Sequence, residues 1–135
     1  MTQPSNPRPA TFSSSAAVVR YQTPHVDRAV AFYTEHLGFQ LKMRSGPGFA
    51  IVARGDLNLI LSGRTTSGAR PMPDGRAQEP GGWNRIVLYV DSLDSAITAL
   101  KEAGAHFRNE IEVGPGGRQI LVEDADGNPI ELHEP

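Results

Sequence analysis

The chain has 135 residues, a formal net charge of −2 at pH 7 and 39% hydrophobic residues, which fits one domain or two small halves sharing a core. Its lysines and arginines form no basic stripe, and it has no apolar run of about 18 residues, so neither nucleic-acid binding nor a membrane span is expected. The first residues lack the apolar centre of a secretory signal, so we expect a cytoplasmic location. Because cysteine is absent, the metal donors available are four histidines and the carboxylates.

The N-terminal part of the chain predicts a flexible arm followed by a first module. Residues 1–15 are rich in Pro, Ser, Asn and Thr and carry too little apolar surface to fold. Residues 17–22 then predict a strand, and the segment VDRAVAFYTEHLGF has apolar residues at helical spacing and a glycine stop at Gly38. Three extended segments follow at 39–44, 49–54 and 57–62, which makes residues 16–62 a βαβββ module.

Residues 63–83, called the linker from here on, have no periodicity and many glycines and prolines, as is typical of a long connection or lid. After the linker the same pattern returns in residues 84–135. A strand at 85–90 precedes a helix in SLDSAITALKEAG, and strands are predicted at 106–113, 118–124 and 129–134. Aligning Val19 with Ile86 also aligns Val26 with Leu93, which indicates an internal repeat.

These two modules predict an α+β fold that forms one domain. Each helix can cover only one face of its sheet, so the other face of each sheet must be buried in another way or used to line a cleft. We therefore predict two βαβββ repeats forming a curved mixed sheet around a cleft.

Three segments together resemble the vicinal oxygen chelate superfamily, which includes glyoxalase I, bleomycin resistance proteins and extradiol dioxygenases. They are VDRAVAFYTEHLGF, WNRIVLYVDSLDSAITALKEAG and the terminal VEDADGNPIELHEP, and the resemblance covers residues 17–135. It implies a divalent metal bound at four strand positions, and those positions fall on Val18, Ile60, Arg85 and Glu131. Only Glu131 is a metal donor, so we predict no metal site, no cofactor, and an Arg85–Glu131 ion pair in place of the metal.

The candidate catalytic residues are Glu131 and His133. Strand alternation places both on the same face, where they could form an acid–base couple or bracket a ligand, although His133 could equally lie at a solvated rim. The other histidines, His25 beside the first helix, His36 in its last turn and His106, are interpreted as structural or surface residues.

Candidate ligand-binding residues lie in the second module. Planar hydrogen-bonding groups are concentrated there, and arginine suits the capture of a carboxylate or phosphate. Solvated positions are an alternative for Arg108 and Arg118, and aromatic residues such as Trp83 could line a pocket or fill the core. The predicted ligand-binding residues are Arg85, Tyr89, Asn84, Asn109 and Arg118.

Two functions remain open, and a third is disfavoured. The first is a metal-independent protein that binds or sequesters a small organic molecule with an anionic or carbonyl group, similar to the bleomycin resistance branch, which implies a homodimer. The second is a metal-free lyase or isomerase with Glu131 as general base. Metal-dependent glyoxalase or dioxygenase chemistry is disfavoured by the ligand count.

Overall fold

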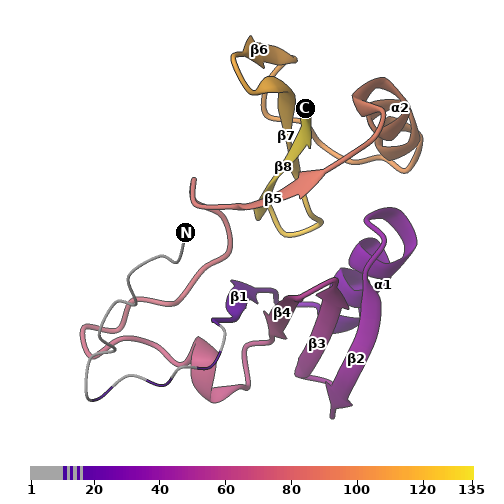
Figure 1. Ribbon diagram of the computed structural model, residues 1–135. Coiled ribbons are helices and arrows are strands. Elements are labelled where there is room, and N and C mark those ends of the chain that lie inside the picture. The colour runs from indigo at the N-terminus through magenta and orange to yellow at the C-terminus, as the bar shows by residue number, and fades with distance from the viewer. Residues whose placement is uncertain (1–10, 12, 14, 16) are drawn as a thin grey trace.

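The computed structural model describes residues 11, 13, 15 and 17–135. The predicted flexible arm, residues 1–15, lies mostly outside the described residues. The described chain forms two similar units, each with one helix and four strands, drawn one above the other in Figure 1. None of the helices in the described part is long and apolar enough to cross a bilayer.

The first unit comprises β1 (Val19–Gln22), α1 (Val26–His36), β2 (Gln40–Ser45), β3 (Phe49–Arg54) and β4 (Leu57–Ser62). Its sheet has the order β1-β4-β3-β2, with β1 parallel to β4 and the other pairs antiparallel. Ala29 and Tyr33, one helical turn apart, are buried on the inner side of α1. The helix ends before Gly38, which adopts the positive φ of 75° that follows many helices.

The second unit repeats this order with β5 (Ile86–Tyr89), α2 (Leu93–Glu102), β6 (Glu112–Gly114), β7 (Gly117–Glu123) and β8 (Pro129–Glu134). Its sheet has the order β5-β8-β7-β6, with β5 parallel to β8. Two side chains cap the start of α2: Ser92 accepts a hydrogen bond from the Ser95 amide, and Glu134 accepts one from the Leu93 amide. The predicted α+β fold of two βαβββ units is confirmed, and each unit has its own four-stranded sheet.

One predicted strand, 106–113, is mostly not a strand. Only Glu112–Gly114 pairs as one, together with an isolated bridge between Phe107 and Val122. The side chain of Asn109 explains the interruption, because its Oδ1 accepts the Leu121 amide hydrogen at 2.9 Å. A continuing strand would have bonded that amide with a backbone carbonyl.

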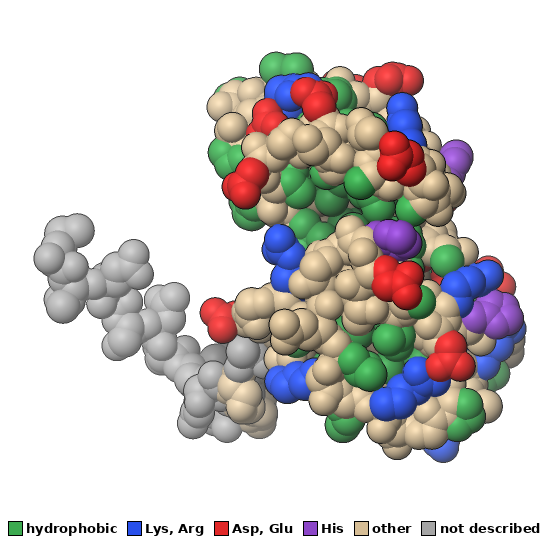
Figure 2. Space-filling model, turned by 90° about the vertical axis from the view of Figure 1, so that its right-hand side faces the viewer, with side chains coloured by type: hydrophobic (Ala, Val, Ile, Leu, Met, Phe, Trp, Pro, Cys, Tyr) green, Lys and Arg blue, Asp and Glu red, His purple; other side chains and the backbone are tan. Residues whose placement is uncertain are grey.

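The helix-bearing sides of the two sheets share one hydrophobic core. The core includes Tyr33 and Leu61 of the first unit together with Leu88 and Leu132 of the second. Tyr21 links the units directly, since its hydroxyl donates to the Pro129 carbonyl at 2.8 Å and accepts the Ile86 amide hydrogen. Seen from the side of the helices, hydrophobic side chains are visible where the units meet, with charged side chains around them (Figure 2).

A buried carboxylate in the turn between β7 and β8 adds a polar contact between the units. Asp124 accepts hydrogen bonds from the Tyr33 hydroxyl at 2.8 Å and from the Asn128 side chain at 3.0 Å. Burial raises the pKa of Asp124, although these hydrogen bonds oppose the shift. Burial also raises the pKa of the Tyr33 hydroxyl well above its ordinary value.

The same turn contacts the segment between β1 and α1. Asp126 accepts hydrogen bonds from Thr23 and from Arg28, and Asn128 donates to the Gln22 carbonyl at 2.9 Å. The D-x-D-G-N sequence is therefore the polar joint between the two units.

The linker, residues 63–83, is folded against the first unit. The Gly63 amide donates to the Gly48 carbonyl at 2.8 Å, and a side-chain carbon at Gly63 would lie only 2.6 Å from that oxygen. The linker contains a short 3-10 helix (Ser67–Ala69), and the Gly68 carbonyl accepts a hydrogen bond from the Gln22 side chain. Gly68 also leaves no room for a side chain, because the Arg20 guanidinium lies against it. These close approaches fix the path of the linker.

Candidate functional site

The candidate site lies on the face of the second sheet that is turned away from α2, called the open face from here on. The side chains of Ile86 and Leu88 point to the core, so Val87 and Tyr89 point to the open face. They pair with Glu131 and His133 of β8. Val87 and Tyr89 are 42% and 64% exposed, so the first unit does not cover this face.

An ion pair lies on the open face near the start of β5. Arg85 donates from Nη2 and Nε to the same Glu131 oxygen, Oε1, at 2.8 and 3.2 Å, and from Nη1 to the Trp83 carbonyl at 3.3 Å. The predicted Arg85–Glu131 pair is confirmed. Glu131 is buried, whereas 29% of the Arg85 side chain is exposed. Since three of the five guanidinium N–H groups suffice for these bonds, two remain for a ligand.

His133 lies on the side of Glu131 that Arg85 does not contact, and the three side chains form a polar cluster. Its Nε2 lies 2.8 Å from the Gly116 carbonyl, and its Nδ1 lies 3.4 Å from Glu131 Oε2. A carbonyl can only accept, so Nε2 carries a proton. Nδ1 faces the Glu131 carboxylate, so the two side chains are neighbours on the open face. The Tyr89 ring packs edge-on against the imidazole, with 5.5 Å between centroids.

An arginine and a tryptophan border the open face. The Arg108 guanidinium lies 4.8 Å from the centre of the Trp83 ring, within cation–π range. Arg108 also forms an ion pair with Glu123 and donates to the carbonyls of Gly82 and Gly127 at 2.6 and 2.9 Å. It thereby holds the end of the linker beside β8. Both side chains are candidates from the sequence, but their contact could not be predicted because the two residues belong to segments that are far apart in the chain.

Three of the predicted ligand-binding residues are not part of this cluster. The Asn109 side chain bonds the backbone of β7, and Asn84 is exposed before β5 begins. Arg118 pairs in register with Glu134, so its side chain lies on the helix side and forms ion pairs with Glu134 and Asp94. Those hydrogen bonds raise the pKa of Arg118.

The histidines interpreted as structural or surface residues lie at the surface. His25, His36 and His106 are exposed, and His36 contacts the Phe32 ring at 5.7 Å between centroids. His25 precedes α1 but its side chain forms no cap.

The four metal positions implied by the resemblance do not fit a metal in this chain. The side chains of Val18, just before β1, and of Ile60 in β4 have no donor atoms, and Arg85 is a cation bonded to Glu131. Among the residues that the structure describes, no three His, Cys, Asp or Glu side chains are grouped so that they could bind an ion. The Glu131 carboxylate is instead engaged by Arg85 and His133.

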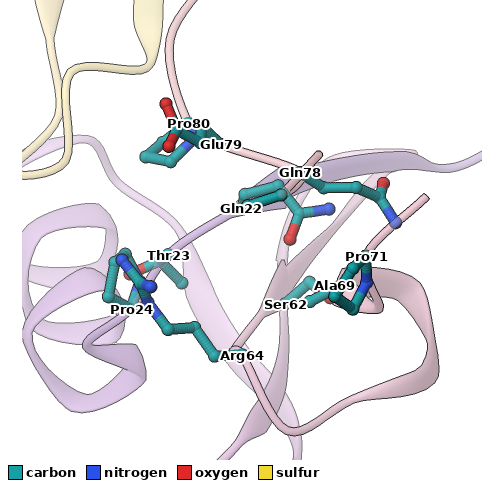
Figure 3. A pocket seen from close by; sticks show the side chains of 11 residues that line it. Gln22, Thr23, Pro24, Ser62, Arg64, Ala69, Pro71, Gln78, Glu79 and Pro80 are labelled. Carbon is teal, nitrogen blue, oxygen red and sulfur yellow. The ribbon is translucent and has the colours of Figure 1, made fainter. Parts of the chain in front are cut away.

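A hollow of about 180 Å³ lies away from the open face, between the first unit and the linker (Figure 3). It is lined by residues from the ends of β1 and β4 and from the linker. Neither Arg85 nor Glu131 contributes to it. The hollow and the Arg85–Glu131 ion pair are therefore separate features of the chain.

Comparison with known proteins gives a consistent assignment. The family model described as the glyoxalase/bleomycin resistance protein/dioxygenase superfamily matches residues 15–132. A search of curated protein sequences found no match. Among solved structures, TnmS3, an antibiotic binding protein from a Streptomyces species, is 27% identical with a TM-score of 0.64, covering 92% of this chain and 99% of that chain.

Two further solved structures share the fold of this chain. A superfamily member from Sphaerobacter thermophilus is 27% identical with a TM-score of 0.67, covering 90% of this chain and 98% of its own. Lactoylglutathione lyase from Agrobacterium tumefaciens has a TM-score of 0.69 over 91% of this chain and 95% of its own, but at 18% identity it supports the fold alone. The chain therefore belongs to the glyoxalase/bleomycin resistance protein/dioxygenase superfamily.

Proposed function

We propose that this protein binds and sequesters a small organic molecule that carries an anionic or carbonyl group, without a metal, on the open face of its second sheet. The observation that carries the proposal is the Arg85–Glu131 pair. It puts a guanidinium where superfamily resemblance implies a metal, and a guanidinium binds ligand oxygen atoms through N–H groups.

The surroundings of the pair suit an organic ligand. Tyr89, Val87 and Trp83 offer exposed apolar or aromatic surface beside Arg85. Apolar walls with a few oriented polar groups are typical of small-molecule sites. The antibiotic-binding relative at 27% identity supports the same kind of ligand.

We further propose that the protein is a homodimer in which a second copy covers the open face. One sheet face buries only one side of a ligand, whereas binding sites usually enclose most of the ligand surface. Exposed Val87, Tyr89 and Trp83, at 42%, 64% and 71%, are suited to burial in such an interface. A cytoplasmic location is part of the proposal. Sedimentation of the purified protein would test the dimer, and a monomer at all concentrations would contradict it.

Fluorescence titration can test the binding site. The chain has a single tryptophan, Trp83, beside Arg85, so its emission reports on the open face. Anilinonaphthalene sulfonate, an aromatic anion, is a suitable probe. We expect the Arg85→Gln variant to bind it about tenfold more weakly, since a charge-assisted hydrogen bond contributes about 1.5–3 kcal/mol. The matched control is Arg118→Gln, which removes a guanidinium from the opposite face of the same sheet. Equal loss in both variants, or no binding by the native protein, would contradict the proposal.

The contact between Glu131 and His133 also supports a second function, a metal-free lyase or isomerase with Glu131 as general base. The Glu131→Gln variant separates the two: a binding protein loses affinity alone, whereas an enzyme loses turnover of bound substrate. Elemental analysis of protein purified without chelator tests the metal-independent part of the proposal. A stoichiometric divalent metal that is lost in Glu131→Gln would overturn it.

A further inference from the structure

The hollow under the linker has the character of a separate binding site. Its walls include the rings of Pro24, Pro71 and Pro80, which give apolar surface with little freedom to move. Its volume of about 180 Å³ is below the roughly 300–1,000 Å³ of pockets that hold drug-sized ligands. A molecule about the size of one amino acid therefore suits it better than a drug-sized ligand.

The hollow is a product of the folded linker. The Gln22 side chain donates to the Gly68 carbonyl, and the Gln78 side chain donates to the Arg70 carbonyl, each at 2.9 Å. Both glutamines thus use their nitrogen atoms to hold the linker, which leaves their oxygen atoms as acceptors. In Figure 3 the oxygen of Gln22 points into the space between Thr23, Ser62 and Arg64.

Two opposite charges border the hollow. Arg64 lies on the side of Thr23 and Pro24, and Glu79 lies on the linker side next to Pro80 (Figure 3). Within the part of the chain that the structure describes, neither side chain makes an ion pair or a hydrogen bond, and both residues are exposed. Their charges are therefore available to a ligand. The guanidinium supplies donors for a carboxylate, and the Glu79 carboxylate and the Gln22 oxygen supply acceptors for an ammonium group.

We propose that this hollow binds a small zwitterionic molecule of the amino-acid class, with its carboxylate at Arg64, its ammonium group at Glu79 and Gln22, and its side chain against the prolines. This site is independent of the open face. Arg85 and Glu131 line no part of the hollow.

Isothermal titration calorimetry with the standard amino acids tests the proposal. For the amino acid that binds most tightly, the methyl ester, which lacks the carboxylate, and the N-acetyl derivative, which lacks the ammonium group, should each bind at least about tenfold more weakly. Arg64→Gln should weaken binding of the parent amino acid and leave binding of the methyl ester unchanged. Glu79→Gln should likewise weaken binding of the parent amino acid and leave binding of the N-acetyl derivative unchanged.

Arg70→Gln is the matched control, because Arg70 is an exposed linker arginine that does not line the hollow. It should bind as the native protein does. Arg85→Gln should also leave amino-acid binding unchanged, which separates this test from that of the proposed function. The proposal is overturned if no standard amino acid binds, if the methyl ester and N-acetyl derivative bind as tightly as the parent, or if Arg64→Gln and Arg70→Gln behave alike.

Discussion

The two sheets have the same strand order, yet the faces turned away from their helices differ in composition and in what covers them. In the first unit, Val18 and Ile60 stand at the positions equivalent to Arg85 and Glu131 of the second unit. The linker lies over the end of the first sheet, whereas Val87 and Tyr89 on the open face of the second are exposed. The helix sides of both sheets form a common core and must fit each other. The opposite faces have no such constraint and can differ in chemistry.

The largest expected effect comes from breaking the ion pair that distinguishes the two sheets. Glu131→Ile leaves Arg85 without its partner, and we expect the free energy of unfolding to fall by about 2–3 kcal/mol. Breaking a fully buried pair costs about 3–5 kcal/mol, and the partial exposure of Arg85 reduces this loss. Urea denaturation measures the difference.

The double variant Arg85→Val/Glu131→Ile gives the second sheet the residues of the first. Replacing a buried ion pair by packed apolar residues is often neutral, so we expect stability to return to within about 1 kcal/mol of the native protein. Binding of anilinonaphthalene sulfonate by the double variant should be about tenfold weaker than that by the native protein, as expected for Arg85→Gln. A double variant as unstable as Glu131→Ile alone would show that the two sheets cannot exchange these residues.

An intermediate effect is expected where the linker contacts the first unit. In Gly63→Ala the new carbon would meet the Gly48 carbonyl oxygen, which is backbone and cannot move freely, so we expect a loss of about 1–2 kcal/mol. In Gly68→Ala the obstacle is the flexible Arg20 side chain, and the loss should be smaller. Trypsin cleavage within the linker should be faster in Gly63→Ala than in Gly68→Ala. Equal, native-like cleavage in both would mean that these close approaches do not fix the linker.

The smallest effect concerns the helix side that the units share, and it depends on pH. Because burial raises the pKa of Asp124 in the folded state, the unfolded chain loses this proton at lower pH than the folded chain does. The carboxyl group therefore makes the free energy of unfolding decrease as the pH rises from its ordinary pKa through its raised one. The Asp124→Asn variant lacks this dependence. Urea denaturation of both proteins over this acidic range measures their free energies of unfolding. The value for the native protein, relative to that for Asp124→Asn, should decrease as the pH rises. A difference that stays constant with pH would contradict a raised pKa of Asp124.

The sequence was sufficient to predict the repeated fold and the ion pair for identifiable reasons. Helical spacing around Tyr33, glycine stops such as Gly38 and alternation within β8 are local signals. Glu131 and His133 could be placed on one face because they belong to a single strand.

Features that join distant segments could not be predicted in this way. Arg118 lies on the helix side because it pairs in register with Glu134. Alternation within one strand separates its two faces, but it does not tell which residues of the neighbouring strand lie on the same face. The contact of Arg108 with Trp83 and the folding of the linker over Gln22 depend likewise on tertiary packing.

The position of β8 has a consequence for the order of folding during synthesis. Of the strands in the two units, β8 comes last in the chain, yet it lies between β5 and β7. The strands of the first unit are all made by Ser62, whereas β5 has no partner in its sheet until residues 129–134 have been added. Until then the helix side of the first unit lacks the surface that completes its core, so we expect apolar residues such as Leu61 and Leu37 to stay exposed in the nascent chain over that interval.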